Sequence, residues 1–474
     1  MSTFYPPGDE LPPDHASDDP SLPGDDPIGS DSDAAIAAIQ DLYASAREAL
    51  SRDKYVQARA ELEIALGLLR SVPRTPTRAH AEAALLAALG IPVQRLDGYA
   101  HTAIHDIYTR LKIEARDTHF LPASFALWLH TLASTDGWNA LQLSLDLVQH
   151  AAGQPFWEVV ACMAVSYTYA CMGYFEATLM YARRAQAIVA SSEPPVDATY
   201  QFEEPLAVTM IVEGFALAHL GDFEAGRARL DAAVTRAEAG GRPNDIVVAR
   251  LHRCWWYVWA QLPEQALLDL RAAKPILTAD GMRYWDSLSE VCYGYVDGLL
   301  IDPVAGAARL KAGTTGYMEL GGNMSREEHL VLLAKLLMHS RQYEDAWDVL
   351  ESAIAISERH GGGMFAPEFY RQRAELLRLL GKVDEAEREL QRALRAALEQ
   401  RSRWMQLRIC LSLARLWDGS PRSGEGCRRV GEALSHLTGG EWMPEVVTAH
   451  AWLQSHEALI RPLEEPGLGI VAAE

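Results

Sequence analysis

The sequence predicts an all-α protein in which antiparallel helix pairs stack into one elongated array. The chain has 474 residues, which is too long for one ordinary hydrophobic core. Hydrophobic residues make up 49% of it, with no long run rich in Val, Ile and Thr between turn signals. This composition favours helices over strands. A 40-residue internal repeat and glycines at its boundaries complete the prediction.

Residues 1–33 are expected to form an acidic, disordered tail. They include seven prolines and nine acidic residues but neither Lys nor Arg. Such a segment cannot bury enough apolar surface to offset the entropy lost on ordering. Asp33 then stands just before the run "AAIAAIQDLY", where it is placed to cap the first helix.

The 40-residue repeat is carried by one apolar column and three columns of small residues. The apolar column consists of Leu230, Leu270, Leu310, Leu350, Leu390 and Val430. Ala, Gly or Cys stands sixteen and four residues before each of these positions, and Ala or Gly three residues after. Small residues at these offsets predict a pair of antiparallel helices whose backbones approach closely, with Leu filling the space between them. Glycines such as Gly241, Gly321 and Gly439 are expected to end the second helices.

This spacing resembles the tetratricopeptide repeat (TPR), lengthened from its usual 34 residues to 40. Ala46, Ala58, Leu62 and Ala65 show the same pattern near the start. The resemblance implies a right-handed α-solenoid of about ten antiparallel helix pairs with a C-terminal capping helix. The expected divisions are a first repeat at 34–72, degenerate helical pairs at 76–151, seven repeats at 156–440, a capping helix at 442–461 and a flexible tail at 462–474.

The C-terminal half has a second resemblance. The run "PEFYRQRAELLRLLGKVDEAERELQRALRAALEQRSRWMQLRICLSLARLWDG" and the later "LSHLTGGEWMPEVVTAHAWLQ" are similar to the MalT-like helical-repeat sensor regions of bacterial signal-transduction ATPases and transcriptional regulators. Those relatives carry a nucleotide-binding module, often with a DNA-binding or cyclase domain. Because this sequence shows none of these modules, the resemblance implies a sensor region that acts on a separate protein.

Charge and cysteine content indicate the compartment and the class of partner. The net charge is -21, so the surface would repel a phosphate backbone, and nucleic acid is not expected as a partner. The six cysteines are scattered and include no CxxC pair, which is typical of reduced core residues. Neither a signal peptide nor a membrane span is recognisable, so a cytoplasmic location is expected.

Catalytic motifs are missing, and we expect a protein that is not an enzyme and has no cofactor. The run "LLGKVDEAE" has Val where a phosphate-binding loop needs Ser or Thr, and neither a GxSxG elbow nor an HExxH motif is present. His101 and His105 have a spacing that suits a metal, but no third ligand stands nearby, so a plain surface pair is the preferred interpretation.

The TPR resemblance implies that the first helix of each pair lines a concave groove. The residue after each small first-helix residue would then point inward, together with the residues four before and four after it. Aromatic and apolar residues fill these positions in the middle repeats, and charged residues fill several of them towards the C-terminus. The predicted groove residues are Met163, Tyr167, Ile211, Phe215, Leu251, Trp255, Trp259, Val291, Tyr295, Leu299, Lys335, Arg371, Arg378 and Arg415. Trp256 falls instead in a steadily apolar column and is expected in the core between helices.

The leading functional hypothesis is a cytoplasmic scaffold or regulatory sensor that binds a peptide segment of another protein in this groove. Apolar side chains of the peptide would contact the aromatic rings, and Lys335, Arg371, Arg378 and Arg415 would take its acidic end. Three alternatives remain. The groove could bind a small sugar-like or apolar effector, its rings could be covered by a tight superhelix or by the acidic tail, or the chain could be an enzyme with an unrecognised site.

Overall fold

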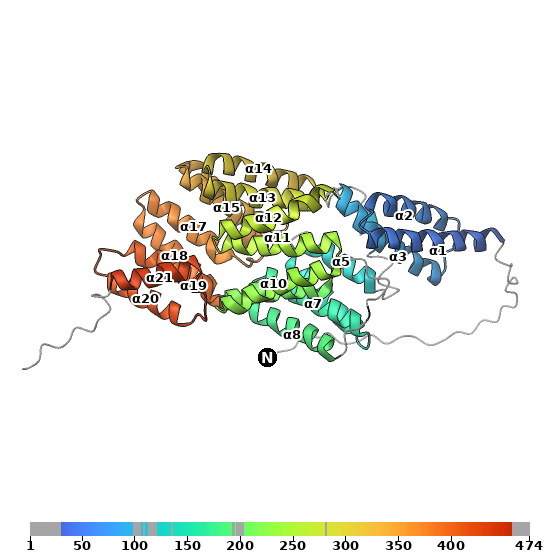
Figure 1. Cartoon of the computed structure of the whole chain (residues 1–474), viewed down its shortest axis with the longest axis horizontal. Helices are drawn as coiled ribbons and strands as arrows, with labels where there is room; N and C mark the ends of the chain where they lie inside the picture. The colour runs from blue at the N-terminus through green and yellow to red at the C-terminus, as the bar shows by residue number, and fades with distance from the viewer. Residues whose placement is uncertain are drawn as a thin grey trace, which may run out of the picture.

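The fold is a helical solenoid of TPR-like pairs (Figure 1), which confirms the predicted fold class. The computed structural model describes residues 30–97, 106–107, 110–111, 121–133, 136–191, 195, 203–279 and 282–456. The predicted tails therefore lie largely outside the described residues, as do His101 and His105. The first helix begins at Ser30, so Asp33 lies inside it and not before it as predicted.

The described helices follow one another in antiparallel order along the chain. Their bounds are α1 (Ser30–Ser51), α2 (Tyr55–Leu69), α3 (Pro76–Asp97), α5 (Leu121–Ala133), α6 (Gly137–His150), α7 (Pro155–Cys171), α8 (Phe175–Ser191), α9 (Pro205–His219), α10 (Phe223–Gly240), α11 (Pro243–Trp259), α12 (Pro263–Ala279), α13 (Arg283–Leu300), α14 (Pro303–Glu319), α15 (Arg326–His339), α16 (Tyr343–Arg359), α17 (Ala366–Leu379), α18 (Val383–Glu399), α19 (Arg403–Leu416), α20 (Ser423–Ser435) and α21 (Pro444–Ser455). From α5 to α20 each odd-numbered helix packs against the even-numbered helix that follows it, and α21 covers the last pair.

The repeat columns mark the contact between the two helices of a pair. Every member of the apolar column is at most 3% exposed. A Cβ atom added to Gly306 would lie 2.3 Å from the Cα atom of Gly298, and one added to Gly294 would lie 2.3 Å from the backbone nitrogen of Leu310. The two backbones of α13 and α14 therefore approach too closely for any side chain, as the small columns predict.

The turns between helices keep the same 40-residue period. Gly221, Gln261, Arg341 and Gly381, which connect the two helices of four pairs, have φ angles of 94°, 57°, 60° and 76°. Gly241, Gly321 and Gly361 follow second helices and have φ angles of 71°, 72° and 81°. This left-handed conformation ends a helix with little strain when the residue is Gly.

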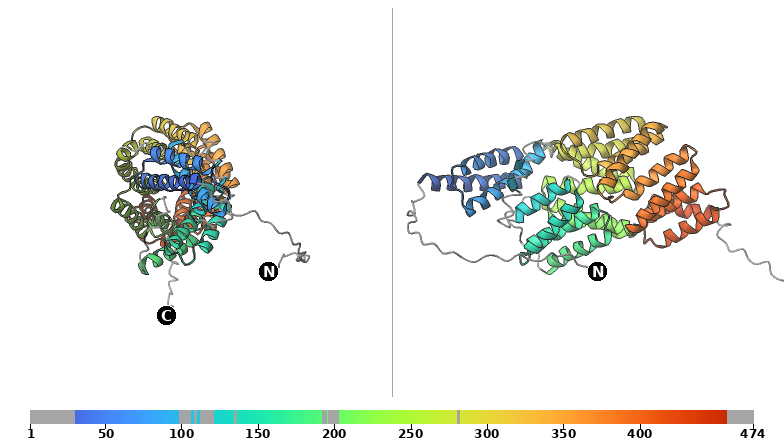
Figure 2. Two further views of the ribbon diagram at one scale, coloured as in Figure 1. Left: turned by 90° about the vertical axis from the view of Figure 1, so that its right-hand side faces the viewer. Right: turned by 180° about the vertical axis from the view of Figure 1, so that it is seen from behind.

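The solenoid curls tightly about its long axis, as the end view in Figure 2 shows. The end of α9 therefore lies beside α19, and the turn between α9 and α10 lies beside the turn between α20 and α21, about two hundred residues later in the chain. The backbone N–H of Thr438 donates to the carbonyl of Gly221 at 2.7 Å, and Trp442 donates to Glu224. Ser402 Oγ is 2.8 Å from His219 Nδ1. These links, named here the closing contacts, bring successive turns of the superhelix together.

Candidate ligand-binding site

Two pockets open on the inner face of the superhelix. The first, named here the aromatic pocket, is lined mainly by the first helices α7, α9, α11 and α13 together with the turns before α15 and α17, and its cavity volume is about 160 Å³. The second, named here the polar pocket, is lined mainly by α15, α17, α19 and the start of α21, with a cavity volume of about 400 Å³. The predicted aromatic groove residues and the predicted cationic ones thus line different pockets.

Five of the predicted groove residues meet in the aromatic pocket. They are Tyr167 of α7, Ile211 and Phe215 of α9, and Leu251 and Trp255 of α11. Each belongs to one of the inward-facing columns, and they share one surface although they are up to 88 residues apart in sequence and Tyr167 stands 48 residues, not 40, before Phe215. Of the four aromatic residues that follow the small first-helix residues, Tyr167, Phe215 and Trp255 line this pocket, and Tyr295 does not.

The rest of this pocket comes from residues that sequence reasoning missed. Tyr284 and Trp285 stand in the first turn of α13, outside the columns considered, and Tyr317 comes from a second helix, α14. Met324 and Ser325, in the turn before α15, and residues 360–364, in the turn before α17, complete the lining. The run of three glycines at 361–363 is a signal that could have marked a turn lying close to the pocket, since glycine permits close backbone approach.

Two acidic residues give the aromatic pocket a polar end. Glu327 and Glu328 stand in the first turn of α15 and are 8% and 7% exposed. Trp255 Nε1 donates a hydrogen bond of 2.9 Å to Glu328. Burial, with the neighbouring Glu327 charge, raises the pKa of Glu328 to about 8 even though this bond favours the charged form. Burial also raises the pKa of Glu327.

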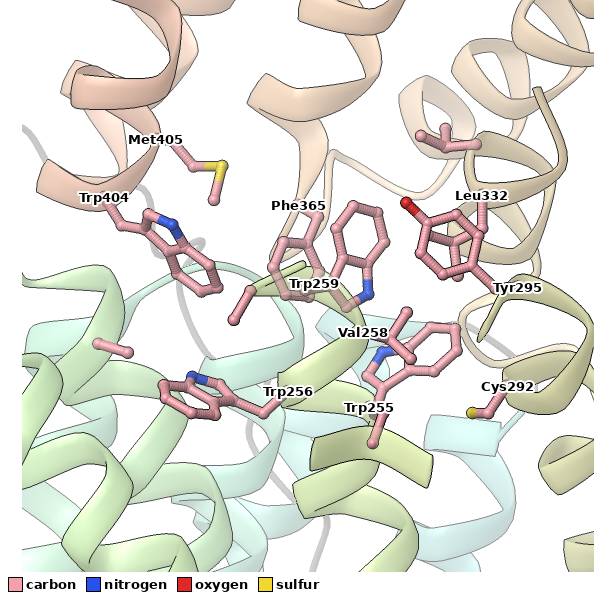
Figure 3. Close-up of a cluster of buried hydrophobic side chains, with 14 of the residues drawn as sticks. Trp255, Trp256, Val258, Trp259, Cys292, Tyr295, Leu332, Phe365, Trp404 and Met405 are labelled. Atoms are coloured by element: carbon pink, nitrogen blue, oxygen red, sulfur yellow. The ribbon is translucent and has the colours of Figure 1, made fainter. Parts of the chain in front are cut away.

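Trp259 separates the two pockets, and its placement corrects a prediction. The ring is fully buried and does not line a groove, because it stacks on Phe365 with centroids 4.0 Å apart (Figure 3). Its edge packs against Trp255, and its carbonyl accepts a 2.7 Å hydrogen bond from Arg408, which lines the polar pocket. The predicted continuous groove is thus divided, because Phe365, which stands just before α17, packs on the Trp259 ring.

Other predicted groove residues also lie outside both pockets. Tyr295 is 1% exposed beneath the ammonium of Lys335, which lies 5.2 Å from its ring centroid. Met163 and Val291 are buried in the core, and Leu299 is half-buried. Tyr295 is covered by the following repeat, since Lys335 stands on α15. Trp256, predicted to lie in the core, is fully buried and packs against Trp404 and Trp442.

The polar pocket contains three of the four predicted cations. Lys335, Arg371 and Arg415 line it, whereas Arg378 is exposed, pairs with Glu375 at 2.5 Å and does not line it. Sequence reasoning missed Arg408 of α19 and Glu445 of α21, which also line the pocket. Arg408 reaches the carbonyl of Trp259 on α11 only because the superhelix closes, and no periodic signal within one repeat reports such a contact.

A carboxylate beside the polar pocket is tightly held. Glu368 is fully buried and accepts two 2.7 Å hydrogen bonds from Arg371. Burial opposes ionisation of this carboxyl, yet Arg371 and Arg408 hold its pKa well below the usual range. Lys335, by contrast, is 5% exposed and its Nζ atom has no hydrogen-bond partner among the described residues. Burial lowers the pKa of Lys335 to about 7, although Glu368 favours its charged form.

Neither a metal cluster nor a membrane span is found among the described residues. Within that part of the chain no three His, Cys, Asp or Glu side chains gather as a metal site would require. No described helix combines the length and apolarity needed to cross a bilayer. All six cysteines are free thiols, five of them buried.

No protein-family model matches the sequence, and no curated protein is similar to it. Solved structures show the same fold. One is a Rap protein complexed with competence and sporulation factor, with a TM-score of 0.55 and 12% identity over 78% of this chain and 99% of that chain. Another is NprR in complex with its cognate peptide NprX, with a TM-score of 0.51 and 9% identity over 74% of this chain and 97% of that chain. These similarities show a TPR-like helical-repeat fold, while the likeness to MalT-like sensor regions stays a prediction.

Proposed function

We propose that this protein is a cytoplasmic, non-enzymatic regulator that binds a peptide segment of a partner through the aromatic pocket. The observation that carries the proposal is the gathering of Tyr167, Phe215 and Trp255 from three successive repeats around one cavity. Buried aromatic side chains supply most of the binding energy at interfaces of this kind. Trp255 is positioned by its hydrogen bond to Glu328, so less side-chain freedom is lost on binding.

The structural comparison supports the peptide as the class of ligand. NprR has this fold and forms a complex with its cognate peptide. A peptide in the aromatic pocket would insert one or two apolar side chains, because the cavity is small and is closed at one end by Trp259 and its stacked neighbour Phe365. The ligand would thus be an apolar segment held end-on, in place of the long extended peptide that the sequence predicts.

Selection from a random peptide library tests this proposal. The protein is expected to enrich peptides with apolar side chains, and the double variant Trp255→Ala, Phe215→Ala to bind the enriched peptides at least about tenfold more weakly, since each ring is worth more than about 1 kcal/mol. Ile301→Ala is the control, because this side chain is 80% exposed away from both pockets. Affinity is measured by fluorescence anisotropy, and folding by circular dichroism.

A folded double variant that binds the enriched peptides as tightly as the unsubstituted protein would show that the aromatic pocket is not the site. If the double variant does not fold, Trp255→Leu combined with Phe215→Leu removes both rings and retains most of the buried apolar volume.

A small-molecule effector is the second candidate, and the division of the groove favours it. The aromatic pocket is confined to a few repeats, because Trp259 stacks on Phe365 beside it, and a short concave pocket lined by aromatic residues suits a small ligand. A screen of sugars and apolar compounds by the change in tryptophan fluorescence distinguishes the two. Saturable binding of a compound by the protein but not by the Trp255→Ala, Phe215→Ala variant, without enrichment of any peptide, would establish this alternative.

A further inference from the structure

Lys335 is the most unusual charged residue of the inner face. It lies in the middle of α15 and is 5% exposed, and its ammonium makes no hydrogen bond to the described residues. A buried ammonium without a partner is costly, so buried charges are normally paired. Lys335 is among the residues that line the polar pocket, so its unpaired ammonium lies at the wall of a cavity that a ligand could fill.

The surrounding charges leave this ammonium uncompensated. Glu368 is engaged by Arg371 and lies 3.8 Å from Arg408, Glu445 is engaged by Arg408, and Glu375 pairs with the exposed Arg378. The lining holds four cations against the two carboxylates of Glu375 and Glu445, in a chain whose net charge is -21. Arg408 contributes a further donor, because its Nε atom is buried without a hydrogen-bond partner, whereas its Nη1 atom lies 3.8 Å from Glu368. The unpaired donors of Lys335 and Arg408 outnumber the unpaired acceptor, Oε2 of Glu445, and such an excess around one cavity is the arrangement that binds an anion.

We propose that the polar pocket binds a carboxylate, which accepts hydrogen bonds from Lys335 and Arg408. The inference rests on the proposed function for the source of that carboxylate, an acidic side chain or the C-terminus of the bound peptide. A carboxylate carries one negative charge and matches the single unpaired buried ammonium. A phosphate group would bring a second negative charge close to Glu375 and Glu445.

The two pockets are close enough to act on one ligand. Trp259 contacts Trp255 of the aromatic pocket through its ring and Arg408 of the polar pocket through its carbonyl. Because Trp259 is buried between the pockets, one peptide occupies both only if it enters each from its own opening, with an apolar side chain in the aromatic pocket and its carboxylate in the polar pocket. The ligand class is therefore a peptide with an apolar segment followed by a negative charge.

Carboxylate binding is coupled to proton uptake at Lys335. The groups that face its ammonium are Tyr295 of α13, Glu368 and Arg371 of α17, Arg408 of α19 and Glu445 of α21, with His339 one turn later on α15. In the empty pocket burial lowers the pKa of Lys335 to about 7, so near pH 8 the amine is mostly neutral. A bound carboxylate favours the charged form, so the complex takes up a proton there.

Titration calorimetry with N-acetylglycine, a minimal carboxylate, tests the site. Titrations near pH 8 in two buffers of different ionisation enthalpy are expected to show saturable binding with net proton uptake. Lys335→Met, which keeps the length of the side chain and removes its charge, is expected to weaken binding at least about tenfold and to abolish the uptake. Lys382→Met is the matched control, since Lys382 is an exposed residue in the turn before α18.

Three outcomes would overturn the inference. They are an unsubstituted protein that does not bind N-acetylglycine, a folded Lys335→Met variant with unchanged affinity, and tighter binding of inorganic phosphate than of N-acetylglycine. Lys335→Gln provides a second neutral variant if Lys335→Met fails to fold. N-Acetylglycine has no apolar side chain, so its binding is expected to persist in the Trp255→Ala, Phe215→Ala variant. Failure of the aromatic pocket and failure of the carboxylate site are thereby distinguished.

Discussion

Lys335 lowers the stability of the folded protein in the absence of a ligand. Its folded-state pKa is about 7, whereas in the unfolded chain it is near 10.5. Between these values the unfolded state binds a proton that the folded state releases, so this residue makes stability rise with pH. Below about pH 7 both states carry the proton, and the full cost of the buried charge is present.

We therefore predict that Lys335→Met stabilises the unliganded protein near pH 6 by about 1–4 kcal/mol, because a buried charge is replaced by an apolar group of similar length. The gain is expected to shrink as the pH approaches 10. Urea unfolding at several pH values, with Lys382→Met as the control, measures both effects. An equal effect of Lys335→Met at all pH values would contradict the assigned pKa.

At the residue scale, the repeat columns predict for some side chains, but not for all, whether they face the groove or the core between helices. The columns place Trp255 on the inner face and Trp256 between helices, as the structure has them. They fail at Trp259, which the same columns place in the groove. The direction of a side chain follows from its position in a repeat, but its exposure depends on Phe365, which lies more than one hundred residues away.

At the scale of helices, the small columns make a prediction about stability. In Gly306→Ala the new Cβ would meet backbone atoms of Gly298 at 2.3 and 2.4 Å, so the helices α13 and α14 must move apart. We expect a loss of about 3 kcal/mol, at the upper end of the usual cost of overpacking. Thermal unfolding followed by circular dichroism measures it.

Gly67→Ala is the matched control for this substitution. Gly67 also lies in a helix, α2, but no atom lies within 4 Å of its added Cβ. The substitution is expected to stabilise the protein by about 0.5–1 kcal/mol, because Ala loses less backbone entropy than Gly. Equal effects of the two substitutions would mean that the close approach of α13 and α14 is not what requires glycine.

The elements themselves were the most predictable part of the protein. The 40-residue period predicts helix pairs, tight turns and close contacts because each repeat buries its apolar column against its immediate neighbours. The pockets were only partly predictable. Tyr317 and Glu327 line the aromatic pocket from positions outside the columns, and Arg408 lines the polar pocket through a contact with Trp259 that has no fixed offset in the sequence.

For the whole molecule, the closing contacts predict an effect at a distance. Trp442 donates to Glu224, packs against Trp256 with ring centroids 5.8 Å apart and lies 4.5 Å from the Arg227 guanidinium. Trp442→Ala is expected to destabilise the protein by about 1–3 kcal/mol. It is also expected to speed amide hydrogen exchange in α10, two hundred residues earlier in the chain. Trp347→Ala, another half-buried tryptophan on α16, is expected to leave exchange in α10 unchanged.

The closing contacts also change how the molecule is expected to unfold. An open repeat array behaves as a one-dimensional chain in which each repeat senses only its neighbours, so it frays from its ends. Here α9 and α10 are held both by adjacent helices and by α19 and the turn between α20 and α21. The array is thus a superhelix whose successive turns are bonded to each other. Unfolding of one superhelical turn therefore removes contacts that stabilise another. Such a superhelix is expected to resist stretching and to unfold cooperatively, so that its inner surface keeps its shape until the whole structure unfolds.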